Sequence, residues 1–369
     1  PMRALDLIGA TLHRRGKAAV IGGGLSGLWL SYELARRGYS VTLYEANSIG
    51  YGASSRAAGI ISLQLPAFLL KYAADGFRAY LEAGLERVVR SLWIPRQDEL
   101  HCIKCITSFL SSEGIYAELM KLEEVSEKLS GLAGDGDEPV VMMDQGMASP
   151  GDAINFLIRA LSMMDFSVKY GPVLRKGNRL LHEGLPIEAD LTFVAAGPWT
   201  PLLVNVNGNL KIYRCAAHSV KGDVPDIIVE DDINGFYIVP ESRDQAIIGG
   251  WDSELTRPED GFRLSSPEAY EVLELVATRL PRAESFYPVS SWAAPCVSGA
   301  DGLPVVGKLD EVYVLTGLNG AGLTLSPGLS RLLVDIAEGI AKEDERLSPS
   351  RLLKGRLSGP EEPFDRLCD

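Results

Sequence analysis

Residues 17–45 read KAAVIGGGLSGLWLSYELARRGYSVTLYE and contain a strand, a glycine-rich turn, a helix and a second strand in immediate succession. The apolar run 18–21 predicts a strand that is buried on both faces. Residues 22–27, GGGLSG, fit the pattern G-x-G-x-x-G, and apolar side chains recur after them at helical spacing. A second strand, 41–44, ends at Glu45. A glycine-rich turn alone is weak evidence, but the complete set of parts predicts a βαβ unit that binds a dinucleotide.

The residues of this unit have distinct physical roles at a dinucleotide site. Gly22 permits the tight turn, Gly24 lets a pyrophosphate approach the backbone, and Gly27 lets the helix pack closely on the strand. The N-terminus of the helix offers N–H groups and the positive end of its dipole to the phosphates. Glu45 stands where a carboxylate accepts a hydrogen bond from a ribose hydroxyl. The alternative is a purely structural βαβ turn, which the full pattern disfavours.

Composition argues against several classes of protein. The chain has 369 residues, enough for two domains or lobes with sizeable cores. Its net charge of −13 disfavours nucleic acid and anionic membrane surfaces as partners. No apolar run has the length of a transmembrane segment, the first residues lack a signal-peptide pattern, and the five cysteines are scattered. We therefore expect a cytoplasmic protein without a disulfide framework.

Several segments after the βαβ unit also carry recognisable patterns. Residues 46–61 are rich in Gly, Ala and Ser, which suits close contact between the backbone and a flat ligand. A helical pattern covers about 66–92. Residues 93–145 combine short strand-like pieces with an acidic helix expected at 116–130. This segment breaks the alternation of strands and helices, and we interpret the break as the start of a second domain.

The second half of the chain alternates between sheet and helix patterns. A buried strand within 189–200 ends in small residues. Residues 210–289 carry the alternating apolar runs of an antiparallel sheet, interrupted by a helix expected at 266–280. Residues 310–340 combine a strand, a glycine-rich loop and a helix, and so predict a second ligand contact at a helix N-terminus.

Cys102 and Cys105 form a C-x-x-C motif. The motif lacks a second cysteine pair or histidines at zinc spacing, so we expect no metal site. We interpret the two residues as strand cysteines without a shared role. A redox disulfide is the alternative.

Four motifs occur in an order and at spacings that resemble those of the FAD-dependent D-amino-acid oxidase family, which includes glycine oxidase, sarcosine oxidase and dye-linked proline dehydrogenases. The resemblance covers about residues 17–340. The motifs are GGGLSG with Glu45, GASSRAAGII at 52–61, FVAAGPWT at 193–200, and DGLPVVGK at 301–308 with LTGLNGAGLTLSPG at 315–328.

The resemblance implies an α/β fold (α+β overall), with a Rossmann-like FAD-binding domain and a second, mainly antiparallel-sheet substrate domain. The FAD-binding domain is expected to be discontinuous, because its motifs are spread along the chain. The expected ranges are 17–92, 146–205 and 290–341 for the FAD-binding domain, 93–145 and 206–289 for the substrate domain, and 1–16 and 342–369 for peripheral termini.

The resemblance also implies FAD as the cofactor. The glycine-rich unit would hold the pyrophosphate, Glu45 the ribose, and the segment 52–61 would run beside the isoalloxazine. The helix that begins near Ser326 would point its positive end at the pyrimidine side of the flavin, where negative charge develops on reduction. The implied cofactor-binding residues are Gly22, Gly24, Leu25, Ser26, Gly27, Glu45, Ala46, Ser54, Ser55, Arg56, Gly59, Ile60, Val173, Ala196, Gly197, Trp199, Asp301, Gly302, Gly320, Ala321, Gly322, Leu323 and Thr324.

Members of this family oxidise a C–N bond by moving a hydride from carbon to flavin N5. The implied substrate is a small amino acid or secondary amine of the glycine, sarcosine, proline or D-amino-acid type. The chain has one G-x-G-x-x-G motif, which disfavours a second nucleotide as the source of electrons. The electrons would leave to a quinone, another carrier or oxygen, and both a homo-oligomer and a hetero-oligomer are compatible with the sequence.

The implied substrate pocket departs from the family at one position. Tyr237 matches a family tyrosine that meets the substrate carboxylate, although an ordinary sheet aromatic would look the same. The carboxylate-binding arginine of the family lies five residues before the Asp of the D-G-x-P motif, where this chain has Cys296. A thiol cannot clamp a carboxylate, so either Arg56 or Arg214 replaces the arginine or the substrate has no α-carboxylate. The predicted pocket residues are Tyr237, Arg56 and Cys296.

Two other functions stay open. A 2-hydroxyacid dehydrogenase would need a base such as histidine near the flavin, and none of the four histidines lies in a flavin motif. A non-catalytic or electron-transfer FAD subunit of a larger amine dehydrogenase complex is the second alternative, which the missing arginine supports to some extent.

Overall fold

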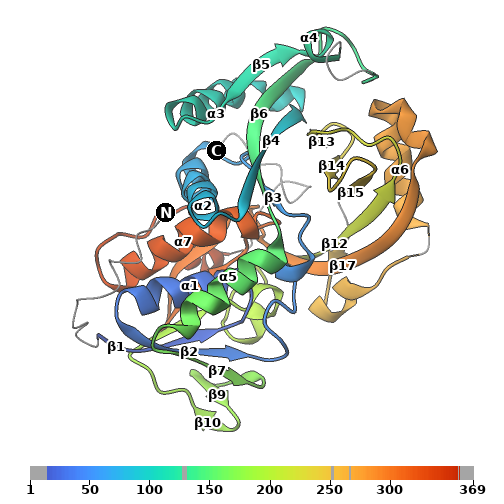
Figure 1. Cartoon of the computed structure of the whole chain (residues 1–369). Coiled ribbons are helices and arrows are strands. Elements are labelled where there is room, and N and C mark those ends of the chain that lie inside the picture. Colours follow the sequence, from blue (N-terminus) through green and yellow to red (C-terminus); the bar gives the residue numbers. More distant parts are fainter. Residues whose placement is uncertain (1–14, 127–130, 251–252, 266, 356, 358–369) are drawn as a thin grey trace.

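The computed structural model contains two lobes, each built on its own sheet (Figure 1). Its mixed α/β architecture confirms the predicted fold class. Of the predicted peripheral termini, 1–14 and 358–369 lie outside the described residues. The structure describes residues 15–126, 131–250, 253–265, 267–355 and 357.

The first lobe contains a six-stranded sheet in the order β18-β19-β11-β1-β2-β7. Its neighbouring strands are parallel except for β18 and β19, and β1 lies between β2 and β11. In such a sheet a ligand binds at the carboxyl ends of the strands, where the direction of winding changes. The strands are β1 (Gly16–Ile21), β2 (Tyr39–Glu45), β7 (Phe166–Tyr170), β11 (Leu191–Val194), β18 (Val305–Leu309) and β19 (Val312–Thr316).

Both faces of this sheet are covered, as the unbroken apolar run in β1 requires. Three helices lie along one face, where Ala18 and Val20 enter the core between helices and sheet. A three-stranded sheet lies against the other face, where Ala19 and Ile21 point. The helices are α1 (Leu25–Arg36), α5 (Pro150–Ser162) and α7 (Gly322–Ala337), and the strands are β8 (Val173–Lys176), β9 (Arg179–His182) and β10 (Leu185–Pro186).

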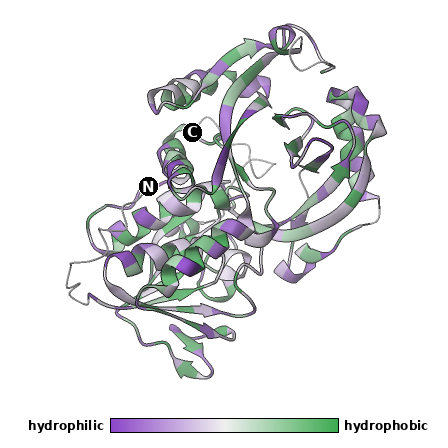
Figure 2. Cartoon of the chain, in the orientation of Figure 1, coloured by the Kyte–Doolittle hydropathy of each residue, from purple (hydrophilic) through white to green (hydrophobic). Residues whose placement is uncertain are grey.

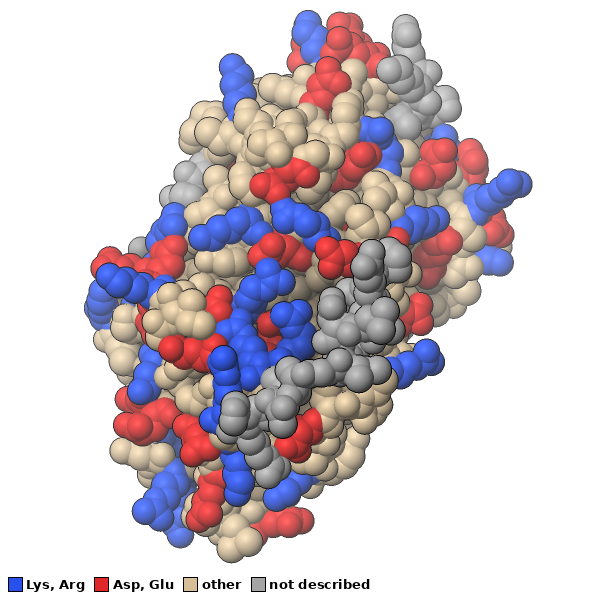
Figure 3. Space-filling model, turned by 60° about the vertical axis from the view of Figure 1, so that its left-hand side comes forward, with Lys and Arg blue, Asp and Glu red and all other residues tan. Residues whose placement is uncertain are grey.

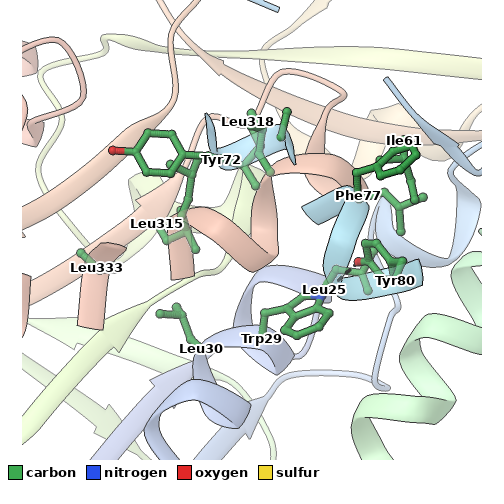
Figure 4. Packing of buried hydrophobic residues seen from close by; sticks show 14 of the residues in the cluster. Leu25, Trp29, Leu30, Ile61, Tyr72, Phe77, Tyr80, Leu315, Leu318 and Leu333 are labelled. Atoms are coloured by element: carbon green, nitrogen blue, oxygen red, sulfur yellow. Dashed lines mark hydrogen bonds between the residues drawn. The ribbon is translucent and has the colours of Figure 1, made fainter. Parts of the chain in front are cut away.

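Helix α2 (Leu70–Glu82) packs on α7 and contacts α1 through an aromatic pair. Figure 4 shows the Trp29 indole beside the ring of Tyr80, whose hydroxyl accepts a hydrogen bond from Trp29 Nε1 at 3.0 Å. A Cβ added at Gly76 of α2 would lie 1.9 Å from the carbonyl oxygen of Thr324 in α7. The two helix backbones therefore approach each other closely, and this contact fixes the N-terminal turn of α7.

The second lobe contains a ten-stranded sheet with the path β16-β12-β15-β14-β13-β4-β6-β3, in which β17 also pairs with β12 and β5 with β6. Within the described residues its pairs are antiparallel except β13 with β4. Helix α6 (Glu268–Arg279) packs on one face, and the other face turns toward the first lobe. Figure 2 shows hydrophobic and hydrophilic residues alternating along the long strands. The strands are β3 (Ile60–Ile61), β4 (Glu86–Ile94), β5 (Ala117–Lys121), β6 (Pro139–Ala148), β12 (Leu210–Lys221), β13 (Ile228–Asp231), β14 (Phe236–Pro240), β15 (Gln245–Gly250), β16 (Glu254–Leu255) and β17 (Tyr287–Gly299).

The helix predicted at 66–92 is wrong in its second half. Helix α2 ends at Glu82, and strand β4 follows after a short turn. The strand forms because this segment pairs over eight residues with β6. Tertiary pairing therefore overrides a local pattern that resembled a helix.

The region 93–145 also differs from its prediction. It contains helix α3 (Leu100–Ser112), whose buried residues Cys102, Ile103, Ile106 and Leu110 recur at helical spacing. The two cysteines of the C-x-x-C motif therefore lie on a helix and not on a strand. In place of the acidic helix expected at 116–130, the described part contains strand β5 followed by helix α4 (Leu122–Ser126), and 127–130 lie outside the described residues.

Short 3₁₀ helices connect the larger elements, and none of the described helices is long and apolar enough to cross a membrane. The 3₁₀ helices are η1 (Ser54–Arg56), η2 (Ala67–Leu69), η3 (Gln97–Glu99), η4 (Gly197–Leu202), η5 (Pro258–Phe262), η6 (Pro281–Ser285) and η7 (Pro349–Leu353).

Three strands, β4, β6 and β17, cross the predicted domain boundaries. Strands β4 and β17 pair within the ten-stranded sheet, although the ranges 17–92 and 290–341 place most of their residues in the FAD-binding domain. The sheet pairing of a strand is not visible in its own sequence, so these boundaries were the weakest part of the division. The division into two discontinuous domains stays a prediction.

The surface charges are interspersed on the face shown in Figure 3, where Lys and Arg side chains lie among Asp and Glu side chains. The net charge of −13 is therefore not gathered into one acidic patch on that face. Ion pairs contribute to this pattern, such as those of Asp75 with Arg78 in the same helix and with Arg331 in α7, at 3.7 and 3.6 Å.

Gly27 packs α1 against β1 in a space that excludes a side chain, because an added Cβ would lie 1.8 Å from the carbonyl oxygen of Gly22. We expect Gly27→Ala to destabilise the fold by about 1–3 kcal/mol, the usual cost of overpacking. Thermal unfolding measures this loss. Gly151→Ala, in the first turn of α5, is the matched control, because its Cβ would make an ordinary contact at 3.7 Å. Equal melting temperatures of the two variants would contradict the packing role of Gly27.

Glu86, the first residue of β4, has two buried carboxyl oxygens without a hydrogen-bond partner among the described residues. Burial raises its pKa from 4.5 to about 8. The folded protein thus binds this proton more tightly than the unfolded chain, and stability falls as the pH rises between these two values.

We expect Glu86→Gln to raise the melting temperature by a few degrees at a pH above the raised pKa. The same variant should have little effect near the ordinary carboxyl pKa, where wild-type Glu86 is already protonated. Glu82→Gln, at an exposed position of α2, is the control for the loss of one negative charge. A shift in melting temperature that is equal at both pH values would contradict the assignment.

Candidate functional site

The two lobes enclose a cavity of about 850 Å³. Its lining comes from the turn after β1, the segment after β2, the loop before α7, and the strands of the ten-stranded sheet that face the first lobe. The cavity thus brings together the glycine-rich segments that lie far apart in the sequence. Its volume is in the upper part of the range typical of ligand and cofactor sites.

The glycine-rich turn after β1 is shaped by steric contacts. Gly22 has a φ of +111°, and an added Cβ would lie 2.4 Å from the carbonyl oxygen of Ala195. Gly24 lines the cavity, and a Cβ there would lie 2.9 Å from Ser54 Oγ. A side chain at this position would therefore crowd Ser54 at the cavity wall. Because Gly24 has none, its backbone is bare toward the cavity, which is what the approach of a pyrophosphate requires.

Glu45, at the end of β2, is held by two backbone donors. The N–H of Gly23 donates to Oε2 and the N–H of Asn47 donates to Oε1, both at 2.7 Å. Glu45 lines the cavity, and each of its oxygens retains a lone pair for a further donor. This arrangement suits the predicted hydrogen bond from a ribose hydroxyl.

The N-termini of α1 and α7 meet at the cavity, and the residue at the N-cap of each forms no side-chain capping bond. The hydroxyls of Ser26 and Ser326 lie 3.0 Å apart and connect the two ends. Ser54 Oγ accepts the N–H of Leu25 at 2.9 Å. First-turn N–H groups have no partner within their own helix, so both ends present donors and positive dipole ends to a ligand.

Thr324, in the first turn of α7, has a buried hydroxyl without a hydrogen-bond partner among the described residues. The residue lines the cavity. A buried polar group in this state indicates a ligand that supplies the missing partner. The cradle at Gly24 and this hydroxyl therefore fit a bound dinucleotide cofactor.

Most of the predicted cofactor-binding residues line the cavity. Four do not, namely Gly27, Ser55, Asp301 and Gly302. Those that do are Gly22, Gly24, Leu25, Ser26, Glu45, Ala46, Ser54, Arg56, Gly59, Ile60, Val173, Ala196, Gly197, Trp199, Gly320, Ala321, Gly322, Leu323 and Thr324.

Asp301 does not line the cavity. Its carboxylate is buried and accepts hydrogen bonds from Arg351, with the Nε to Oδ2 distance at 2.7 Å. It also accepts the N–H of Leu303 at 3.2 Å. Asp301 and Gly302 therefore belong to a turn between β17 and β18 that Arg351 fixes from the side away from the cavity.

The end of the cavity formed by the ten-stranded sheet, here called the sheet end, contains Glu230, Asp232, Tyr237, Cys215 and Cys296. Tyr237 lies across from Gly249 on β15, where an added Cβ would come within 2.3 Å of the tyrosine hydroxyl. Burial raises the pKa of Tyr237 above its ordinary value, so its hydroxyl stays protonated. The structure thus brings the predicted residues Tyr237 and Cys296 together.

Glu230 and Asp232 were not among the residues that the sequence patterns indicated. Glu230 lies in β13 and Asp232 one residue beyond its end, and both line the cavity. Burial raises the pKa of each carboxyl to about 7. Two carboxylates at the end of a buried strand were the available signal, but only the strand order shows which face they share.

The arginines proposed to replace the family clamp are engaged elsewhere. The guanidinium of Arg56 donates to the carbonyl oxygens of Tyr51 and Gly52 and lies over the ring of Phe262. Arg214 forms an ion pair with Glu268 and does not line the cavity. Arg56 lines the cavity but its contacts hold the segment 52–61 in place.

Arg96 is a further cation in the cavity lining that the sequence did not indicate. Its guanidinium pairs with Glu99 at 2.9 Å, and its charge lowers the pKa of nearby Asp232 against the stronger effect of burial. The glutamate therefore balances part of the positive charge of Arg96.

Comparison with known proteins agrees with this geometry. The family model for FAD-dependent oxidoreductases (DAO) matches residues 17–336. Glycine oxidase of Pseudomonas aeruginosa is 26% identical over 363 residues, covering 88% of this chain and 95% of that protein. D-proline dehydrogenase of Pyrobaculum islandicum is 25% identical, covering 88% and 96%. The crystal structure of glycine oxidase from Geobacillus kaustophilus superposes with a TM-score of 0.77 at 23% identity, covering 91% and 98%, which supports the fold.

The match extends over most of the chain. It includes the segments that line the end of the cavity away from the ten-stranded sheet, here called the nucleotide end, which are the turn after β1, the segment after β2 and the loop before α7. The open backbone at Gly24 and the unpartnered hydroxyl of Thr324 fit the cofactor of this family. The chain therefore belongs to the DAO family of FAD-dependent oxidoreductases, and its cofactor is FAD.

Proposed function

We propose that the protein oxidises the C–N bond of a small amine or amino acid and passes the electrons through FAD to a separate acceptor. The observation that carries the proposal is the sheet end of the cavity. There the protonated hydroxyl of Tyr237 and the carboxyl of Glu230 face the same space that continues to the nucleotide cradle. Neither Tyr237 Oη nor Glu230 Oε1 has a hydrogen-bond partner among the described residues.

The arrangement favours oxidation of an amine over oxidation of an alcohol. An alcohol hydroxyl is a far weaker acid than an ammonium group and needs a stronger base than a carboxylate, and the three histidines that the structure describes do not line the cavity. An amine must only lose the proton of its ammonium form before hydride transfer. A carboxylate whose pKa lies near neutrality, as at Glu230, suits this proton.

FAD, when bound, supplies the acceptor for the hydride equivalent that leaves the substrate carbon. The chain itself binds and orients the substrate. Tyr237 donates a hydrogen bond to it, Glu230 Oε1 takes the ammonium proton, and the apolar wall around Ala216, Ala217 and Ala294 excludes water. The N-terminus of α7 lies at the cavity, and its positive dipole end would stabilise the negative charge that a reduced flavin carries.

The relatives named glycine oxidase and D-proline dehydrogenase support substrates of this size. The acceptor is a quinone, another carrier or oxygen, and we retain a cytoplasmic location as a prediction. An FAD subunit without catalysis of its own, in a larger complex, is the remaining alternative. The cavity argues against it, because such a subunit has no need of a polar group at the sheet end.

The test is anaerobic reduction of the purified holoenzyme by a panel of amines, amino acids and hydroxy acids. We expect loss of the flavin absorbance with at least one amine or amino acid and with no hydroxy acid. Readmission of air then separates an oxidase from a dehydrogenase. Reduction by hydroxy acids alone, or by no compound although FAD is bound, would overturn the proposal.

Tyr237→Phe removes the hydroxyl from the sheet end and leaves the ring over Gly249. We expect KM for the reducing substrate to rise about tenfold with a smaller change in kcat, because the lost hydrogen bond is made already in the bound substrate. Steady-state kinetics with the substrate from the panel measures this, and Tyr270→Phe, at an exposed position on α6, is the control. An unchanged KM would assign Tyr237 to the packing of the sheet instead.

A further inference from the structure

Glu230 is held so that one carboxylate oxygen faces the cavity. Its Oε2 accepts hydrogen bonds from Gln64 Nε2 and Gln145 Nε2, both at 2.6 Å. Its Oε1 accepts none from the described residues. Two amide donors on one oxygen orient the carboxylate and leave the other oxygen for a donor that enters the cavity.

Asp232 adds a second carboxylate to the same wall. It is anchored by the Trp93 indole, whose Nε1 donates to Oδ2 at 2.6 Å. Glu230 and Asp232 are close enough that the negative charge of Asp232 raises the pKa of Glu230 further. Two carboxylates that disfavour each other's charge are stabilised when a cation occupies the space between or beside them.

Arg96 offsets part of the negative charge of Asp232, but the cations around this wall form other contacts as well. Arg96 pairs with Glu99 at 2.9 Å, Arg56 donates to backbone carbonyls, and Arg214 pairs with Glu268 outside the cavity. The position of the family clamp is a cysteine, Cys296. Among the described residues, the sheet end thus combines two carboxylates with a neutral tyrosine and thiols, and the one cation near Asp232, Arg96, is itself paired with Glu99.

We propose that the substrate is a small primary or secondary amine of net positive charge, bound through its ammonium group by Glu230 and not through an α-carboxylate. Asp232 contributes the second negative charge. Tyr237, on the neighbouring strand β14, forms the adjacent part of the cavity wall. An amine without a carboxylate meets this wall with charge complementarity, whereas a carboxylate would be repelled by it. The inference rests on the proposed oxidation of a C–N bond, and it adds which group of the substrate the protein binds.

The first test measures binding without turnover. The probes are tert-butylammonium and pivalate, which share one shape and carry opposite charges, and the first has no hydrogen on the carbon next to nitrogen to lose. We expect tert-butylammonium to perturb the flavin absorbance of the holoenzyme at a concentration at least about tenfold lower than pivalate.

The variant Glu230→Gln keeps the shape of the side chain and removes its charge. We expect it to retain FAD and to lose the preference for the cation, and Asp232→Asn to lose part of it. Glu271→Gln, at an exposed position of α6, is the matched control and should behave as wild type. If Glu230→Gln does not fold, the result for Asp232→Asn decides. Tighter binding of pivalate, or a preference unchanged in the glutamine variant, would overturn the inference.

A second measurement covers the case in which neither probe enters the cavity. Sarcosinamide is a cation, and sarcosine is the zwitterion of nearly the same shape. More efficient anaerobic reduction by sarcosinamide supports the inference, and more efficient reduction by sarcosine overturns it while the proposed function stands. Cation binding that depends on Glu230, without reduction of the flavin by any amine, would overturn the proposed function but support the binding of an ammonium group by Glu230. Neither binding nor reduction would overturn both.

Discussion

The contact between Gly22 and Gly27 is the constraint on which the cofactor lobe depends. The first turn of α1 lies against the end of β1 at a distance that leaves no space for a single Cβ. This contact directs the N-terminus of α1 into the crevice at the carboxyl end of the sheet. Ser26 then meets Ser326, so the N-terminus of α7 reaches the same point. Two helix ends and one open stretch of backbone are thereby assembled around a single cavity.

The ten-stranded sheet supplies the chemistry that the first lobe lacks. Its face toward the cavity is largely apolar, which keeps water out and strengthens each polar interaction made there. Tyr237 can point into this space because the facing position on β15 is a glycine. The nucleotide end is built from backbone groups and is common to a large family, whereas the sheet end is built from side chains and distinguishes one substrate from another.

Two carboxyl groups with raised pKa values illustrate how burial has different consequences at different places. Glu86 lies outside the cavity lining and has no hydrogen-bond partner in the described part of the chain, so its burial costs stability when it is ionised. Glu230 is oriented by two glutamine amides and opens to the cavity, so its burial prepares a site for a cation. A raised pKa alone does not separate these cases. The geometry of the neighbouring donors does.

The sequence by itself determined the dinucleotide unit, the glycine-rich segments and the family, because steric requirements at a turn leave a local pattern of residues. It also indicated Tyr237 and the missing arginine at Cys296 through the order of the motifs. Strand β4, helix α3 and the inward positions of Glu230 and Asp232 were decided by the tertiary structure. Pairing with a distant strand determines whether a segment is a strand and which of its faces is buried. Asp301 shows the same limit, because its motif is local but its partner Arg351 is fifty residues away.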